Sequence, residues 1–242
     1  MENNDYCFVE KKIYNKKQII FTGCGGMISY YFGVAKYLQE NYNLENIIFG
    51  GVSGGSIVSF FLSIEKDMEV IFKDASKDLC YNLSKSSTGA LFNMIELLKK
   101  YLEGYIKKEG DEELYKILNE KDLFISISSL YPTKNLVSKW HHNNDLIDCI
   151  LTSCSLPLLG QTFFKNYREN YCLDGAFYNN KPVLYRELPY LIITPYKWRL
   201  IPPSWFTFSC DKEWHGYLFE LGYKDAKDNK SEFDNYLEKI IN

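Results

Sequence analysis

The chain has 242 residues, 46% of them hydrophobic and 24% charged, which is the composition of a globular protein with a substantial core. Its 28 basic and 31 acidic side chains leave a net charge of -3, so nothing in the charge balance indicates a nucleic-acid partner. The seven cysteines are an odd number without C-x-x-C spacing, which argues against disulfides or a zinc site and indicates a reducing, cytoplasmic compartment. Residues 1–12 lack the apolar run of a signal peptide.

The first motif is a glycine loop between a predicted strand at 16–22 and a predicted helix at 27–43. This order presents several backbone N–H groups to an anion, and two interpretations compete for it. A dinucleotide site needs G-x-G-x-x-G, but Ile28 occupies the third glycine position. The alternative is an oxyanion hole formed by the backbone of the loop residues Gly23, Cys24, Gly25 and Gly26.

The stretch 47–61 has the pattern of a buried strand, a sharp glycine turn and a helix. Gly51-x-Ser53-x-Gly55 is the pattern of a nucleophile elbow, in which a strained turn exposes one serine hydroxyl. Glycines at 51, 54 and 55 suit such a turn because strand and helix pack too closely there for a Cβ. Ser53 would also stand at the helix N-terminus, where the helix dipole favours developing negative charge. The stretch therefore predicts a serine nucleophile.

The middle of the chain is predicted to alternate helices and strands. In chain order we expect a helical pattern over 65–108, interrupted by a polar loop at Ser84–Gly89, and then a short helix from an Asp111 cap to Asn119. Strands are expected at 123–129 and 135–140. A helix over 145–153 follows, which Asn143 or Asn144 caps and Leu156-Pro157 ends. Alternation of this kind predicts an α/β fold with a mainly parallel sheet. The segment 84–108 is a candidate lid over a pocket, with an inert connector as the alternative.

An aspartate follows the next predicted strand. Tyr171-Cys-Leu delivers Asp174 to the end of that strand, and Gly175 permits a tight turn after it. Asp-Gly pairs are common in turns, so the functional interpretation of Asp174 depends on its meeting Ser53. A last strand is predicted at 188–194, and helices follow on the periphery over about 195–242. We expect one domain over 1–242, with its motif-bearing core at about 17–194.

Three motifs thus stand in order: Gly23-Cys-Gly-Gly-Met-Ile28, Gly51-Val-Ser-Gly-Gly55 and Asp174-Gly-Ala176. Together they resemble the patatin-like phospholipase family. The stretches 21–25, 30–35 and 145–157 look especially similar to its adiponutrin and adipose triglyceride lipase branch. The resemblance covers about 17–182 and implies a three-layer α/β/α fold with a mainly parallel central sheet.

The resemblance also implies a catalytic dyad without metal or cofactor, in which Ser53 is the nucleophile and Asp174 the base. The expected substrates are carboxylic esters of phospholipids, lysophospholipids or acylglycerols, presented at a membrane or lipid-droplet surface. Two positions depart from the family pattern. Ile28 replaces the last glycine of the loop and is expected to tilt the start of the following helix. Met27 stands where many members have Arg or Lys, which disfavours a phosphate-binding cation there.

Three alternatives remain open at this stage. Ser53, Asp174 and His215 have the chain order of an α/β-hydrolase triad, although the elbow comes unusually early for that fold. A lipid-binding or regulatory module with little turnover would be compatible with Ile28, whereas the intact serine and aspartate disfavour it. A nucleotide-binding oxidoreductase would leave the serine elbow without a purpose. His141-His142 lacks partners at metal-ligand spacing, so we expect no metal there.

The aromatic segment 202–208, with Trp198 and Trp214 beside it, is the predicted lipid-contacting surface, and Lys197 and Arg199 are available for head groups. The alternative is that this segment packs over the last strand. We expect a cytoplasmic protein that associates peripherally with membranes, although a secreted effector or a viral protein would show the same features. The sequence leaves open whether a protein activator is needed.

Overall fold

The computed structural model describes residues 15–84, 93–131, 134–157 and 163–240. Two predictions fall on residues outside these ranges: the one about residues 1–12 and the one about the polar loop beyond Ser84. Within the described ranges, no helix is both long and apolar enough to cross a membrane.

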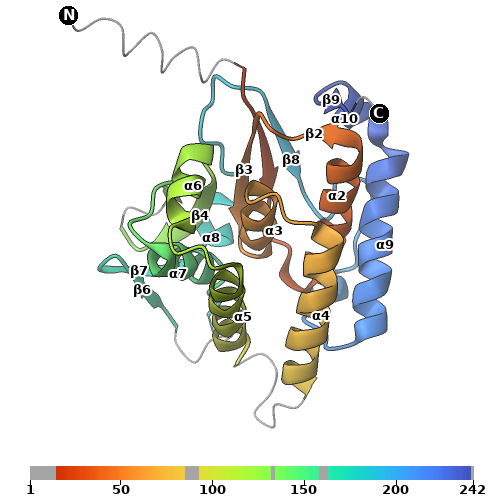
Figure 1. Ribbon diagram of the computed structural model, residues 1–242. Coiled ribbons are helices and arrows are strands. Elements are labelled where there is room, and N and C mark those ends of the chain that lie inside the picture. Colours follow the sequence, from red (N-terminus) through yellow and green to blue (C-terminus); the bar gives the residue numbers. More distant parts are fainter. Residues whose placement is uncertain (1–14, 85–92, 132–133, 158–162, 241–242) are drawn as a thin grey trace, which may run out of the picture.

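A central sheet of seven strands organises the molecule (Figure 1). Its strands are β1 (Lys17–Phe21), β3 (Ile47–Val52), β4 (Phe124–Ser129), β5 (Asn135–Val137), β6 (Lys165–Tyr167), β7 (Asn170–Asp174) and β8 (Tyr190–Ile193). They lie in the order β6-β7-β4-β3-β1-β8, with β5 also paired to β4. The centre, from β8 to β4, is parallel, and β5, β6 and β7 are antiparallel additions at one side. The sheet is therefore mainly parallel at its core, as predicted.

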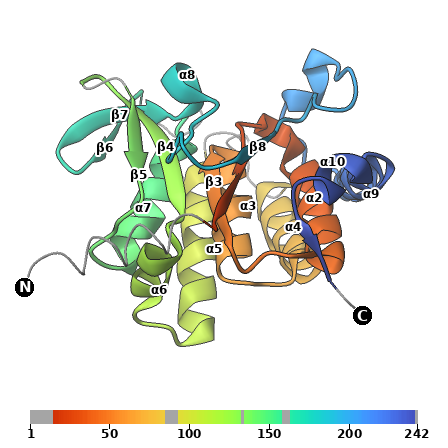
Figure 2. The same ribbon diagram turned by 90° about the horizontal axis from the view of Figure 1, so that it is seen from above.

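Helices cover the sheet on both faces, which makes the fold a three-layer α/β/α arrangement. They are α2 (Ile28–Asn41), α3 (Gly54–Ser63), α4 (Met68–Ser84), α5 (Met94–Glu109), α6 (Leu114–Lys121), α7 (Asn143–Ser153), α8 (Ala176–Asn179), α9 (Lys212–Asp228) and α10 (Lys230–Asp234), with 3-10 turns η1 (Gly25–Met27) and η2 (Pro203–Phe206). The two layers are unequal: α2, α3, α4 and α5 lie together on one side of the strands and the short α8 on the other (Figure 2). The thinner layer also includes Val183 and Leu184, which pack on Ile20, Ile48 and Phe124.

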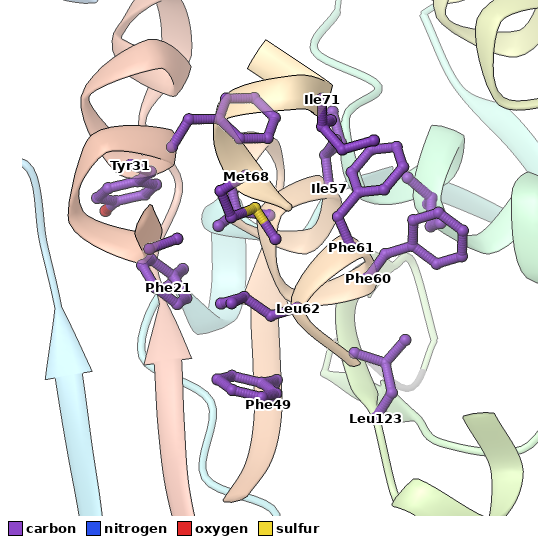
Figure 3. Close-up of a cluster of buried hydrophobic side chains, with 14 of the residues drawn as sticks. Phe21, Tyr31, Phe49, Ile57, Phe60, Phe61, Leu62, Met68, Ile71 and Leu123 are labelled. Carbon is purple, nitrogen blue, oxygen red and sulfur yellow. The ribbon is translucent and has the colours of Figure 1, made fainter. Parts of the chain in front are cut away.

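The main hydrophobic core lies between the sheet and the larger helical layer. Figure 3 shows Phe21 and Phe49 from the strands close to Leu62 and Met68 from the helices. Phe21 is fully buried and meets Tyr31 of α2 edge-to-face, with ring centroids 5.2 Å apart. Burying side chains of this size contributes roughly 1.5–3 kcal/mol each, so this layer supplies most of the stabilisation. The whole of α3 is buried, which suits its sequence of apolar residues, glycines and serines without a charged residue.

The C-terminal segment contributes to this core as well. Helix α9 runs alongside α2 (Figure 1). The approach is so close that a Cβ on Gly33 would stand 1.9 Å from the Phe219 carbonyl oxygen, and one on Gly222 would stand 2.0 Å from that of Tyr30. Beyond α10 the chain forms β9 (Glu238–Lys239), which pairs with β2 (Tyr42–Asn43), so the peripheral helices predicted over about 195–242 do not continue to the end of that segment.

Several predicted boundaries differ from the structure in detail. Helix α7 begins at Asn143, and the side chain of His142 caps it by accepting a hydrogen bond from the Asp145 N–H. The prediction of an asparagine cap was therefore wrong, because the Nδ1 of His142 accepts the capping hydrogen bond in place of an asparagine side chain. Asp111 does not cap α6, which begins at Leu114. The Asp111 carboxylate accepts a hydrogen bond from the Glu113 N–H, in the turn that precedes the helix.

Candidate active site

The predicted elbow is a sharp turn in the structure. Strand β3 ends at Val52, α3 begins at Gly54, and Ser53 between them has φ 53° and ψ -130°. Non-glycine residues rarely adopt this region, and holding one there costs about 1–3 kcal/mol. A Cβ on Gly51 would lie 2.4 Å from Ser56 Cα, and one on Gly55 would lie 2.2 Å from the Phe21 carbonyl oxygen. The flanking glycines are therefore required for the helix to pack this closely on β3 and β1.

The sheet order brings Asp174 next to this turn. Strand β4 lies between β3 and β7, with Ser126 paired to Val52 and Ile127 paired to Asp174. Ser53 and Asp174 thus end two strands that flank one common neighbour. Gly175 is needed at the turn, because a Cβ there would stand 2.1 Å from the Ser126 carbonyl oxygen.

The carboxylate of Asp174 is completely buried. Burial raises its pKa from 3.8 to about 6, while the neighbouring Ser53 hydroxyl and the Ala176 N–H lower it. Its Oδ1 accepts from the Ala176 N–H at 2.8 Å. Its Oδ2 has no hydrogen-bond partner within the described part of the chain. The Ser53 hydroxyl nevertheless lies close enough to the carboxylate to lower its pKa. A desolvated carboxylate with an unused lone pair beside a serine has the properties of a general base.

The glycine loop lies against the elbow. A Cβ on Gly54 would be 2.6 Å from Cys24 Sγ, so the starts of α2 and α3 abut one another. Gly25 has φ +51°, a conformation that strongly favours glycine. The Gly23 N–H donates to Asn180 Oδ1 at 2.7 Å, which leaves it unavailable for the oxyanion hole predicted from the sequence. The N–H groups of Cys24, Gly25 and Gly26 have no hydrogen-bond acceptor among the described residues.

Ile28 has an ordinary helical backbone, with φ -56° and ψ -35°, so no glycine is required at this position. The loop reaches α2 through the 3-10 turn η1. The Ile28 side chain lies 3.6–3.7 Å from the site of a Cβ on Gly54 and forms part of a pocket wall. The departure from the family pattern therefore adds apolar surface next to Ser53.

An apolar cavity of about 140 Å³ lies beside Ser53. Its walls come from α2, α3, α4, α5 and the segment 208–215, and include Phe32, Ile57, Phe61, Phe72, Leu98 and Phe208. The described part of the candidate lid is helix α5, which supplies one of these walls. The size and apolar lining suit the hydrocarbon chain of an acyl group.

Two buried thiols border the same site. Burial, with Cys154 and Asp174 nearby, raises the pKa of Cys24 well above its usual value. Burial and Asp174 also raise the pKa of Cys154. Both cysteines therefore stay protonated at neutral pH and are poor nucleophiles.

His215 lines the cavity but is engaged elsewhere. Its Nε2 lies 2.8 Å from the Ser209 carbonyl oxygen and its Nδ1 lies 2.8 Å from Ser29 Oγ. Because a carbonyl can only accept, Nε2 carries a proton and donates to Ser209, while Nδ1 is hydrogen-bonded to the Ser29 hydroxyl. No hydrogen bond joins His215 to Asp174 in the described residues, so the histidine connects α2 to the segment before α9.

The aromatic segment packs onto the protein. Trp205 meets Trp214 edge-to-face with ring centroids 5.0 Å apart, and Trp198 donates to Glu232. A Cβ on Gly26 would lie 2.0 Å from the Thr207 carbonyl oxygen, so residues 206–207 form a strap over the glycine loop. The most exposed apolar side chain of the region is Leu200, at 98% exposure.

Sequence reasoning missed two residues that support the site. Asn180 follows the turn after Asp174 and fixes the Gly23 N–H, and no sequence pattern points to it. Ser153 accepts the Ser53 N–H at 2.8 Å. It lies in the stretch 145–157 on which the family resemblance partly rests. The sequence therefore pointed to this stretch but not to the role of Ser153.

The family model for patatin-like phospholipases matches residues 19–186, more than half of the chain. The protein therefore belongs to the patatin-like phospholipase family, a family of lipid acyl hydrolases. Among its relatives are mouse "1-acylglycerol-3-phosphate O-acyltransferase Pnpla3", 26% identical over 172 residues, and human "Patatin-like phospholipase domain-containing protein 4", 26% identical over 176 residues. Each match covers 68% of this chain but only 40% of the mouse protein and 66% of the human one.

Among solved structures, VipD from Legionella pneumophila is similar, with a TM-score of 0.49 at 15% identity over 74% of this chain and 49% of that protein.

Proposed function

We propose that the protein is a lipid acyl hydrolase that cleaves carboxylic esters through an acyl-Ser53 intermediate, with Asp174 as the base. The observation that carries this proposal is the fully buried Asp174 carboxylate, whose Oδ2 lacks an aligned partner beside the strained Ser53. Hydrogen bonds of catalytic pairs are often long or misaligned before substrate binds, so this geometry suits a resting dyad.

The reaction follows from the positions of these groups. Ser53 Oγ attacks the ester carbonyl carbon while its proton passes to Asp174. The carbonyl oxygen becomes an oxyanion facing the free N–H groups of Cys24, Gly25 and Gly26, and two helix N-termini add favourable potential. Collapse expels the alcohol, which takes the proton from Asp174. Water then gives its proton to Asp174 and attacks the acyl-serine, and the fatty acid leaves as Ser53 regains its proton.

The cavity supports the proposed substrate class. Its walls are apolar and it begins at Ser53, so the acyl chain would lie between α3 and α5 while the alcohol part faces outward. The proposed substrates are phospholipids, lysophospholipids and acylglycerols at a membrane or lipid-droplet surface. Peripheral association with that surface is part of the proposal, and the exposed Leu200 is the best-placed contact.

Acyl transfer is a second candidate function. The mouse relative is named as an acyltransferase, and an acyl-Ser53 intermediate can pass its acyl group to a lipid hydroxyl instead of water. The apolar cavity beside Ser53 favours this partition. Transfer would appear as a new ester when a lysophospholipid acceptor is added, whereas hydrolysis releases only fatty acid.

The test is the intact mass of the purified protein after reaction with a fluorophosphonate probe. We expect one adduct on the wild type, none on Ser53→Ala, and labelling slowed by about 100-fold or more on Asp174→Asn, the usual contribution of a general base. An adduct on Ser53→Ala would refute the proposal. A folded wild type that acquires no adduct would favour the lipid-binding module.

The same experiment separates the dyad from a triad. If His215 were the base, His215→Gln would lose labelling as completely as Asp174→Asn. Both nitrogens of His215 are occupied by Ser29 and Ser209, which supports the dyad. We therefore expect His215→Gln to lose only part of the labelling rate, because it weakens the contact between α2 and Ser209.

A further inference from the structure

The described structure contains a polar contact at the elbow that the proposed mechanism does not use. Ser153, the last residue of α7, is fully buried. Its Oγ accepts from the Ser53 N–H at 2.8 Å and donates to the Ser126 carbonyl oxygen at 2.7 Å. Both hydrogen-bonding functions of the hydroxyl are thus committed, which leaves the side chain no alternative orientation.

This contact acts on the most strained residue of the site. Ser53 has φ 53°, and such a conformation persists only where the surroundings over-determine it. On its carbonyl side, Ser53 accepts from Ser56 N–H at 2.8 Å and from Ser56 Oγ at 2.6 Å, both within the same turn. On its N–H side, Ser153 is the partner and comes from a separate helix. The two sides together hold the peptide planes that aim the Ser53 hydroxyl.

The same end of α7 also holds the aspartate. The Gly175 N–H donates to the Ser153 carbonyl oxygen at 3.2 Å, and the Asp174 N–H donates to that of Ser155 at 2.9 Å. One short segment therefore contacts the backbone of both Ser53 and Asp174. Because these residues end different strands, a common support at α7 fixes their separation in a way that β3 and β7 alone do not.

We propose that Ser153 is a positioning residue for the reaction: its hydroxyl holds the Ser53 backbone in the strained conformation and sets the approach of Ser53 Oγ to Asp174. This inference rests on the proposed function. Ser153 touches neither the substrate cavity nor the Asp174 carboxylate, so its role is confined to geometry. Its removal should lower turnover without changing how tightly the acyl chain binds.

The test compares Ser153→Ala with Ser63→Ala. Ser63 is a matched control because it is also a buried serine, and its hydroxyl donates to the Ser59 carbonyl oxygen at 2.8 Å, outside the site. We expect Ser153→Ala to slow fluorophosphonate labelling and kcat on a soluble ester by roughly 10- to 100-fold, the effect of misplacing a reacting group. KM should stay within about twofold and the pH midpoint should not move, because cavity and base are intact. Ser63→Ala should label like the wild type.

Amide hydrogen exchange supplies a readout that does not depend on activity. The Ser53 amide should exchange faster in Ser153→Ala than in the wild type, because it has lost its only acceptor among the described residues. The inference would be overturned if Ser153→Ala were labelled at the wild-type rate and its Ser53 amide exchanged no faster. It would also be overturned if Ser63→Ala slowed labelling as much as Ser153→Ala does. If the wild type itself does not label, the proposed function fails and Ser53 exchange alone decides whether Ser153 positions the turn.

Discussion

The raised pKa of Asp174 links activity and stability in opposite directions. Burial lifts this pKa from 3.8 to about 6, and only the ionised form can accept the Ser53 proton. With that value, about one carboxylate in eleven is ionised at pH 5 and about ten in eleven at pH 7. We therefore expect kcat/KM on a soluble ester to rise about tenfold between pH 5 and 7 and then to level off.

Stability should change with the opposite sign. The folded-state pKa lies above the unfolded value, so the folded protein binds more protons between pH 3.8 and about 6. The free energy of unfolding therefore falls as pH rises through this window and stays lower above it. The rise in pKa from 3.8 to about 6 corresponds to about 3 kcal/mol, an upper bound for this single group.

Asp174→Asn removes this ionisation while keeping the side-chain shape. At pH 8 the variant should be more stable than the wild type by up to about 3 kcal/mol, and the difference should vanish below about pH 4. Chemical denaturation at several pH values measures this gap, and initial rates on the same preparations give the activity profile. A variant less stable than the wild type by the same amount at every pH, or a wild-type kcat/KM that is flat from pH 5 to 7, would refute the reasoning.

Three further predictions follow from packing and exposure. Gly55→Ala should lower the free energy of unfolding by about 1–3 kcal/mol or more, since its Cβ would meet the Phe21 backbone at 2.2 Å. Gly104→Ala, whose Cβ would meet nothing within 4 Å, should raise the free energy of unfolding by about 0.5–1 kcal/mol. Thermal melts of the two variants compare these effects. Leu98→Trp should fill the cavity and raise KM roughly tenfold for long-chain esters but not for acetyl esters, and an equal effect on both would contradict the assigned acyl site. Leu200→Ser should weaken sedimentation with anionic phospholipid vesicles while soluble-ester turnover persists, and unchanged sedimentation would remove Leu200 from the lipid-contacting surface.

Much of the fold was predictable because it depends on local patterns. The apolar run before the glycine loop predicted β1. The stretch 123–129, in which apolar and polar residues alternate, predicted β4, and the stretch 135–140 predicted its partner β5. One consequence of the alternation was not visible: both faces of β4 are buried. The hydroxyls of Ser126 and Ser128 bond to the backbone carbonyls of Asn179 and Gly175, so the polar face of β4 supports the turn after Asp174 instead of facing water.

The sequence by itself determined which groups are proposed to react, because glycines flanking one serine and a glycine after one aspartate are steric requirements that a short stretch of chain expresses. Only the tertiary structure decided how those groups are supported. Ser153, Asn180 and the walls of the cavity come from elements distant along the chain, and their contacts depend on strand order and helix packing. A hydrogen bond across 100 residues, such as that between Ser53 and Ser153, leaves no periodicity to recognise, since either partner alone is an ordinary serine.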